Sequence, residues 1–133
     1  MESVRVLVVE DYLPFRRCLC SILERRANLQ VIGEVSDGIE AVSKAEELQP
    51  NLILLDIGLP MLNGIEAARR IRELCPESKI LFVSQESSAD IVQEAFRVGA
   101  LGYVVKTHAG SELLAAVDAL CQDRQFCEER IVE

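Results

Sequence analysis

The sequence predicts an α/β domain in which a doubly wound, five-stranded parallel sheet lies between two layers made of five helices. Three observations lead to this prediction. Short apolar runs alternate with longer helical patterns five times along the chain, as β-α-β crossovers require. The apolar runs are rich in Val, Ile and Leu, which is typical of strands covered on both faces. The chain has 133 residues, which suits one such domain and is too short for an eight-stranded barrel.

The first half of the chain begins with two predicted strands and two predicted helices. Residues 4–9 (VRVLVV) are mostly β-branched and predict a buried strand, whereas residues 30–35 (QVIGEV) alternate in part and predict a weaker one. Apolar residues recur every three or four positions from about 13 to 26 and from 39 to 48. This spacing predicts two amphipathic helices, the second of which ends at Pro50.

The rest of the chain repeats the alternation. Three further strands are predicted at residues 51–55, 79–83 and 101–105. Helical patterns follow them at residues 65–74, from about 90 to 98, and at 113–121. Ser87 with Asp90 is a capping-box pattern that would open the second of these helices, which would end at Gly99.

Composition narrows the classes of partner and the compartment. Fourteen basic against twenty-two acidic residues leave a formal charge of −8, so broad binding to nucleic acid or an anionic membrane is not expected. The longest apolar runs have four or five residues, so no membrane span is expected, and residues 1–9 do not resemble a signal peptide. Five cysteines, an odd number, indicate reduced, core-filling thiols and a cytoplasmic protein.

Polar residues follow four of the predicted strands at the point where each ends. Glu10 and Asp11 follow the first strand, Asp56 the third, Ser84 the fourth and Lys106 the fifth. Each alone is more often a cap or a solvated residue, but the carboxyl ends of parallel strands meet at one edge of a sheet. Grouped carboxylates repel one another unless a cation joins them, and ligands that offer only oxygen suit Mg²⁺. No Cys or His stands at these ends, which argues against zinc.

Four motifs occur in order over roughly residues 3–122, namely Glu10-Asp11, Asp56-Ile57-Gly58-Leu59-Pro60 with Asn63-Gly64, Ser84, and Gly102-Tyr103-Val104-Val105-Lys106. In these motifs the sequence resembles the receiver domain of two-component response regulators. The resemblance implies the flavodoxin-like strand order 2-1-3-4-5 and a phosphorylation-dependent switch.

The resemblance also implies a phosphoacceptor and a metal site. Asp56 would accept a phosphoryl group from a phosphohistidine on a sensor histidine kinase. Mg²⁺ would be bound directly by Asp11 and through water by Glu10, and Asp56 and the backbone carbonyl of Gly58 would complete the site. Such a domain is a signalling domain and not an enzyme, beyond Mg²⁺-dependent self-phosphorylation from small donors and self-dephosphorylation.

Three further residues would bind the phosphoryl group or change position in response to it. The resemblance implies that Lys106 pairs with one phosphoryl oxygen and that Ser84 swings in to hydrogen-bond another. Tyr103 would be the aromatic switch that follows Ser84 inward, a role compatible with its being a core aromatic. The surface expected to change runs from about residue 84 to 120.

The last part of the chain points to a missing partner domain. Residues 115–131 resemble the end of receivers whose next domain is a helix-turn-helix DNA binder. We therefore expect a receiver at 1–122 and the start of a linker at 123–133, leading to an output domain that is absent here, with a free-standing receiver as the alternative. DNA would be bound only through that domain. No membrane partner is expected, and a homodimer is left open.

Departures from the family pattern keep one alternative open. Thr107 stands where receivers usually have proline, and Gln85 where they usually have a small residue, which would alter the Lys106 loop and access to the phosphoryl group. The alternative is a degenerate receiver that acts as a phosphorylation-independent interaction module. A haloacid-dehalogenase-type phosphatase would need a second Asp at Gly58, and a flavin carrier would need a phosphate loop in place of Glu10-Asp11.

Overall fold

The computed structural model describes residues 3–127, in which strands and helices alternate along the chain. The strands are β1 (Val4–Val9), β2 (Leu29–Val35), β3 (Leu52–Leu55), β4 (Lys79–Ser84), β5 (Gly102–Val105) and β6 (Phe126–Cys127). The α-helices are α1 (Leu13–Leu23), α2 (Gly38–Leu48), α3 (Gly64–Leu74), α4 (Ala89–Arg97) and α5 (Ala109–Cys121). A short 3-10 helix, η1 (Lys106–His108), joins β5 to α5. The predicted α/β fold class is confirmed.

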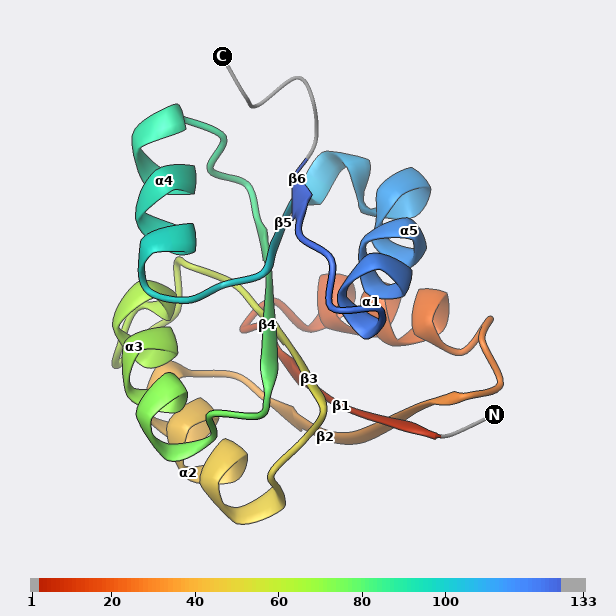
Figure 1. Ribbon diagram of the computed structural model, residues 1–133, viewed down its shortest axis with the longest axis horizontal. Helices are drawn as coiled ribbons and strands as arrows, with labels where there is room; N and C mark the ends of the chain where they lie inside the picture. The colour runs from red at the N-terminus through yellow and green to blue at the C-terminus, as the bar shows by residue number, and fades with distance from the viewer. Residues whose placement is uncertain (1–2, 128–133) are drawn as a thin grey trace.

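The described strands form one parallel sheet in the order β2-β1-β3-β4-β5-β6 (Figure 1). The first five strands have the predicted order. The sixth strand was not predicted, and it extends the sheet beyond β5, with Phe126 opposite Gly102 and Cys127 opposite Tyr103. A strand of two residues is too short to show any periodicity, so the sequence pattern could not reveal it.

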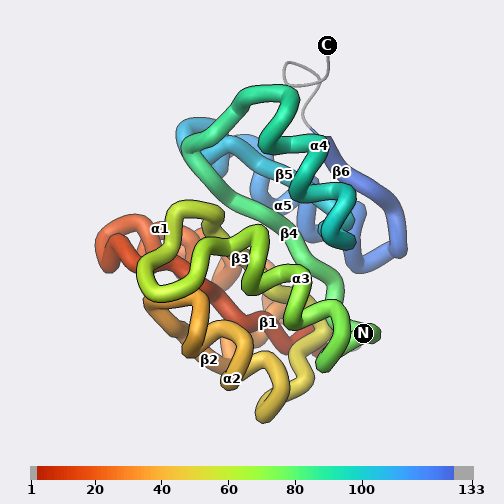
Figure 2. The backbone as a smooth tube through the Cα atoms, turned by 90° about the vertical axis from the view of Figure 1, so that its left-hand side faces the viewer, coloured from red at the N-terminus to blue at the C-terminus, as the bar shows by residue number. Residues whose placement is uncertain are grey.

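Helices cover both faces of the sheet. In Figure 1, α2, α3 and α4 lie on one side and α1 and α5 on the other, and Figure 2 shows the first group from outside. Alternate residues of β1 enter different layers, because successive side chains of a strand point to opposite faces. Leu7 and Val9 join the core on the α2–α4 side, whereas Val6 and Val8 join the core on the α1–α5 side. Both faces are therefore buried, as the apolar strands predict.

The start of α4 differs from the prediction. The helix begins at Ala89, and its N-cap is Ser88, whose hydroxyl accepts a hydrogen bond from the Ile91 N–H at 3.3 Å. The predicted capping box of Ser87 with Asp90 was therefore wrong by one position. Adjacent serines offer the same hydroxyl to the backbone, and the sequence does not show which of the two takes the cap.

The cysteines are thiols, but the prediction that they fill the core holds only in part. Cys75 is buried, whereas Cys18 on α1 and Cys121 at the end of α5 are exposed. Helical periodicity placed these residues on helices without fixing which side of the helix they occupy.

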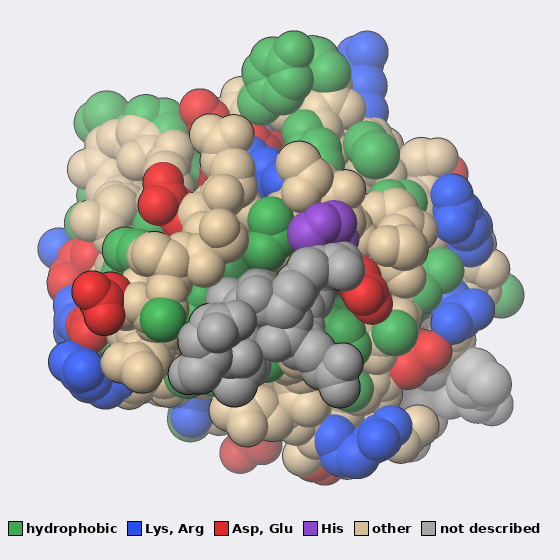
Figure 3. Space-filling view, turned by 90° about the horizontal axis from the view of Figure 1, so that it is seen from above, with side chains coloured by type: hydrophobic (Ala, Val, Ile, Leu, Met, Phe, Trp, Pro, Cys, Tyr) green, Lys and Arg blue, Asp and Glu red, His purple; other side chains and the backbone are tan. Residues whose placement is uncertain are grey.

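The surface carries charges of both signs. Figure 3 shows acidic and basic side chains around the same face, among hydrophobic and neutral ones. Within the described part of the chain, no helix is both long enough and apolar enough to cross a bilayer.

Candidate functional site

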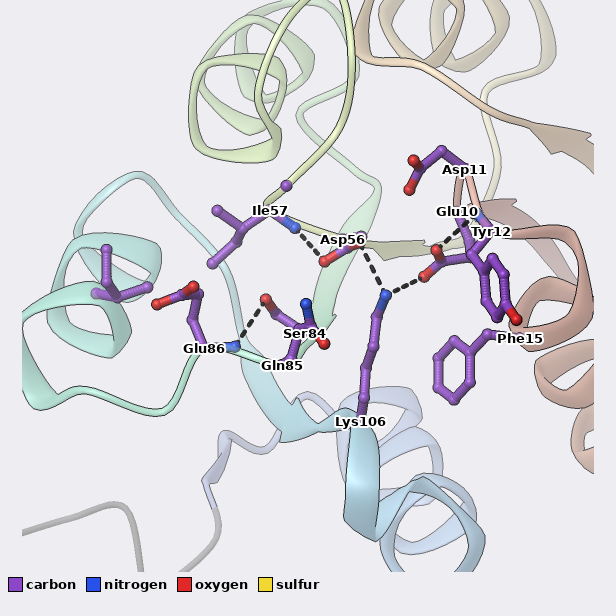
Figure 4. Close-up of a pocket in the computed structure, with 12 residues that line it drawn as sticks. Glu10, Asp11, Tyr12, Phe15, Asp56, Ile57, Ser84, Gln85, Glu86 and Lys106 are labelled. Atoms are coloured by element: carbon purple, nitrogen blue, oxygen red, sulfur yellow. Dashed lines mark hydrogen bonds and ion pairs between the residues drawn. The ribbon is translucent and has the colours of Figure 1, made fainter.

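A cavity of about 670 Å³ opens where β1, β3, β4 and β5 end. It is lined by the residues that the sequence places at these strand ends, including Glu10, Asp11, Asp56, Ser84 and Lys106 (Figure 4). Parallel strands bring their carboxyl ends to one edge, which explains why residues nearly 100 positions apart meet here. The structure thus brings together the polar groups that sequence reasoning expected to converge.

The buried β3 strand and a tight loop after it hold Asp56. Asp56 itself is 5% exposed, and its Oδ1 accepts a hydrogen bond from the Ile57 N–H at 2.7 Å. The loop closes on itself because the Gly64 N–H donates to the Ile57 carbonyl at 2.7 Å, while Asn63 caps α3. A Cβ at Gly64 would lie 1.9 Å from the Asp56 carbonyl oxygen, so only glycine permits this approach. The Asn63-Gly64 motif therefore fixes the backbone of Asp56.

Lys106 reaches the carboxylates from the other end of the site. Its ammonium nitrogen lies 3.0 Å from Asp56 Oδ2 and 2.8 Å from Glu10 Oε1. The same nitrogen lies 5.0 Å from the centre of the Phe15 ring, a cation–π distance. Thr107 is accommodated in η1, directly after Lys106, and the ammonium still reaches Asp56.

Three acidic groups lie close together beside this ammonium, which pairs with two of them, Glu10 and Asp56. Carboxylate oxygens of Glu10, Asp11 and Asp56 lie within 4.8 Å of one another, and Glu10 is 1% exposed. Burial is the largest influence on the Glu10 carboxyl and raises its pKa, against the opposing effect of Lys106. Burial alone would lower the pKa of Lys106, but the hydrogen bonds and charges of Glu10 and Asp56 outweigh it and raise that pKa. The ammonium therefore stays charged.

The acidic cluster has room for a cation. Glu10 Oε2 accepts the Tyr12 N–H at 2.9 Å, and among the described residues Glu10 Oε1 is held only by the Lys106 ammonium, at 2.8 Å. Asp11 is exposed at the mouth of the cavity, and Gly58 also lines it. Three carboxylates against one ammonium leave two negative charges uncompensated, and oxygen ligands of this kind fit Mg²⁺.

Ser84 and Tyr103 meet at one backbone segment. The buried Ser84 hydroxyl lines the cavity and accepts a hydrogen bond from the Glu86 N–H at 3.3 Å. Tyr103 is fully buried beside the cavity, and its hydroxyl donates to the Glu86 carbonyl at 2.8 Å. Glu86, two residues after β4, thus connects the two groups that the sequence singled out as switch residues.

Sequence reasoning missed some of the apolar and backbone contributors. Phe15, Ile91 and the main chain of Tyr12 help to form the site, as does Glu86. Phe15 could have been predicted to line the site, because it lies in the first turn of the helix that follows Glu10 and Asp11. The role of the Glu86 carbonyl could not, because every residue has a backbone carbonyl. Gln85, noted as a departure from the family pattern, is exposed at the cavity wall.

Comparison with known sequences assigns the family. Residues 6–118 match the family described as the response regulator receiver domain. The chain is 34% identical over 128 residues to the transcriptional regulatory protein LiaR of Bacillus subtilis, covering 96% of this chain and 61% of LiaR. It is 35% identical over 114 residues to the chemotaxis protein CheY of Thermotoga maritima, covering 86% of this chain and 94% of CheY. The chain thus spans less than two thirds of LiaR and most of CheY.

Solved structures agree with this assignment. A LuxR-family two-component response regulator from Aurantimonas sp. SI85-9A1 matches with a TM-score of 0.93 and 31% identity, covering 98% of this chain and 93% of that one. The receiver domain of NarL from Mycobacterium tuberculosis matches with a TM-score of 0.86 and 30% identity, covering 93% of this chain and 100% of that one. The family match over most of the chain, the relatives and the shared fold show that the chain belongs to the response regulator receiver domains.

Proposed function

We propose that this receiver domain accepts a phosphoryl group from a sensor histidine kinase onto Asp56, beside a bound Mg²⁺ ion. One observation carries the proposal. The nearly buried Asp56 carboxylate faces a cavity in which it lies 3.0 Å from the Lys106 ammonium and within 4.8 Å of two further carboxylates. A nucleophile, a metal-binding set and a cationic partner for the product are thereby within reach of one another.

The chemical step needs no other protein group to react. A carboxylate oxygen of Asp56 attacks phosphorus, the P–N bond of the phosphohistidine breaks, and the imidazole leaves with the electron pair and takes up a proton from solvent. Lys106 would move its pairing from Asp56 to a phosphoryl oxygen, and the Ser84 hydroxyl would leave the Glu86 N–H for another. Phosphoryl transfer depends mainly on such positioning and charge stabilisation.

Asp11, Asp56, the Gly58 carbonyl and, through water, Glu10 would hold the metal. When bound, Mg²⁺ supplies positive charge that offsets the crowded carboxylates and the transferred phosphoryl oxygens. The two negative charges of the cluster that Lys106 does not compensate support this assignment.

The consequence of phosphorylation would be a change in the surface that controls an output domain, and Tyr103 would be the aromatic that responds to Ser84. We place the receiver at residues 1–122 and the start of the linker at 123–133. The similarity to LiaR supports an output in transcription, with DNA bound by a domain beyond this chain. We place the protein in the cytoplasm, where its kinase partner would present the phosphohistidine.

Phosphoryl uptake by the purified chain tests the proposal directly. Incubation with Mg²⁺ and phosphoramidate, a small donor with the same P–N bond, should add the mass of one phosphoryl group to the intact protein. Asp56→Asn and chelation of Mg²⁺ should each abolish the gain, and Asp90→Asn, which changes an exposed acid on α4, should leave it intact. Equal labelling of Asp56→Asn would show that another residue is the acceptor.

The alternative, an interaction module that works without phosphorylation, predicts no gain with this donor or with acetyl phosphate. The ion pairs of Lys106 with Glu10 and Asp56, and the nearby Asp11 carboxylate, argue against it. The same mass measurement therefore decides between the two functions.

A further inference from the structure

The chain that leaves α5 turns back and runs along the outer edge of β5. The reversal is built at Asp123, whose backbone lies in the left-handed region with φ of 61°. The N–H groups of Asp123 and Arg124 donate to the carbonyls of Leu120 and Ala119 at 2.9 and 2.8 Å. The Asp123 carboxylate also pairs with Lys79 at 2.7 Å, which ties the turn to the start of β4. The turn directs the following residues parallel to β5.

The segment then joins the sheet as β6. The Phe126 N–H donates to the Leu101 carbonyl at 3.0 Å, and Phe126 lies opposite Gly102. A Cβ at Gly102 would lie 2.8 Å from a methyl group of Leu120 and 3.4 Å from the Phe126 carbonyl oxygen. Glycine at this position therefore allows α5 and β6 to approach β5 closely.

The two residues of β6 reach the two layers of the domain. Phe126 packs against the apolar cluster on the α1–α5 side of the sheet, and Cys127 packs against the cluster on the α2–α4 side. This division follows from the alternation of side chains along a strand. Tyr103 belongs to the cluster that Cys127 contacts and is the residue opposite it in the strand pairing.

Tyr103 joins this edge to the phosphoryl site. Its hydroxyl donates to the Glu86 carbonyl at 2.8 Å, on the segment whose N–H is bound by Ser84. Burial raises the pKa of Tyr103 to about 12, and a smaller effect in the same direction comes from Cys127. The same phenol is therefore packed between the loop at the cavity and the segment that leaves the domain.

We propose that the outer edge of β5, together with the inward-facing Tyr103, is the surface that holds residues 122–127, and that docking of β6 and the inward position of Tyr103 stabilise each other. A strand of two residues is held by few backbone hydrogen bonds, so its docking is among the least stable parts of the fold. Because coupling between two positions is reciprocal, whatever favours inward Tyr103 also favours docked β6. The segment that occupies this surface is residues 122–127 of the same chain.

The relation of this surface to signalling rests on the proposed function. Movement of Ser84 toward a phosphoryl group on Asp56 would release the Glu86 N–H and alter the loop to which Tyr103 is bonded. Phosphorylation would then change how firmly the segment leading out of the domain is held. The coupling between Tyr103 and β6 is a separate claim, and unphosphorylated protein can test it.

Amide hydrogen exchange on the full chain, resolved by NMR at the Phe126 N–H, measures docking. Tyr103→Phe keeps the ring but removes the bond to Glu86, and it should speed exchange at Phe126 at least about fivefold, the lower end of typical coupling between sites. Tyr12→Phe is the matched control, because Tyr12 is 63% exposed and is the other tyrosine of the chain. Unchanged exchange in Tyr103→Phe, or equal changes in both variants, would overturn the proposal.

The reciprocal experiment starts from β6. Cys127→Asp places a charge against Tyr103 and should shift the NMR signals of the Tyr103 ring, whereas Cys121→Asp, at an exposed cysteine outside β6, should not. Mg²⁺ with phosphoramidate should change exchange at Phe126 in the wild type but not in Asp56→Asn. If the wild type takes up no phosphoryl group, the proposed function fails, and the Tyr103 and Cys127 variants alone decide the docking proposal.

Discussion

The strands of the sheet begin at one edge, the amino edge, and end at the opposite one, the carboxyl edge. These two edges use polar side chains in opposite ways. At the amino edge two buried or half-buried side chains bind main-chain carbonyls: Arg5 donates to the carbonyls of Leu48 and Gln49 at 2.7 and 2.8 Å, and the Ser78 hydroxyl donates to the Pro50 carbonyl at 2.5 Å. These bonds satisfy carbonyls at the end of α2 and in the loop that follows it. The polar groups at this edge therefore complete the fold.

At the carboxyl edge the partners are ionisable side chains that need one another. Lys106 is shared between Glu10 and Asp56, and within the described residues Glu10 Oε1 has no partner other than this ammonium. Ion pairs buried in this way add little net stability. Removing one partner strongly destabilises the protein, because the other charge is left buried and unpaired. The difference shows how to distinguish the two roles of a polar residue at a strand end. A residue whose hydrogen bonds are met by the main chain supports the fold, whereas a residue whose partners are other ionisable side chains belongs to a chemical site. Four variants, from the largest expected effect to the smallest, test this distinction.

Lys106→Met should have the largest effect, because it leaves Glu10 and Asp56 buried without a cation. We expect the free energy of unfolding to fall by about 3–5 kcal/mol in the presence of a chelator, as for other broken buried pairs. Added Mg²⁺ should recover part of this loss in the variant. Urea unfolding with and without Mg²⁺ measures both effects. Lys44→Met, at an exposed ion pair on α2, is the control, and an equal loss there would contradict the interpretation.

Tyr103 provides a pH test beside the same edge. Its pKa is raised from 10.0 to about 12, so its contribution to stability is fully present below pH 10 and is lost as the pH rises through 12. Over this interval the wild type should lose ~2–3 kcal/mol more than Tyr103→Phe, which has no phenol to ionise. Urea unfolding at stepped pH measures the difference. Parallel pH curves for the two proteins would show that ionisation of Tyr103 is not linked to folding.

Arg5→Met tests the amino edge. The variant keeps the apolar stem but loses the guanidinium bonds to the end of α2, which should lower the free energy of unfolding by about 2 kcal/mol. Phosphoryl uptake from phosphoramidate should proceed at the wild-type rate, because the edge takes no part in the chemistry. Arg17→Met, at an exposed position on α1, should leave both quantities unchanged. A slower uptake in Arg5→Met would break the division between the two edges.

The contrast also explains what the sequence could predict. Buried strands such as Leu52–Leu55 and the chemical groups that follow them, such as Asp56 and Lys106, are visible because both depend on residue type at a fixed place in a periodic pattern. The Glu86 carbonyl that Tyr103 binds is invisible, since every residue has a carbonyl. The strand β6 is invisible for a different reason, because its two residues become a strand only through pairing with β5.

Phe15 should show the smallest effect, and it tests whether an apolar neighbour belongs to the charged site. The ring centre lies 5.0 Å from the Lys106 ammonium, so Phe15→Leu keeps an apolar side chain but removes the ring's attraction for the charge. A double-mutant cycle with Lys106→Met isolates that attraction from packing, and we expect a coupling of about 0.5–1 kcal/mol in the free energy of unfolding. Phe96→Leu, at a partly buried position on α4, should show no coupling to Lys106→Met. A coupling near zero for Phe15 would mean that the ring only packs against the lysine stem, and the charged edge would then be built from ionisable groups alone.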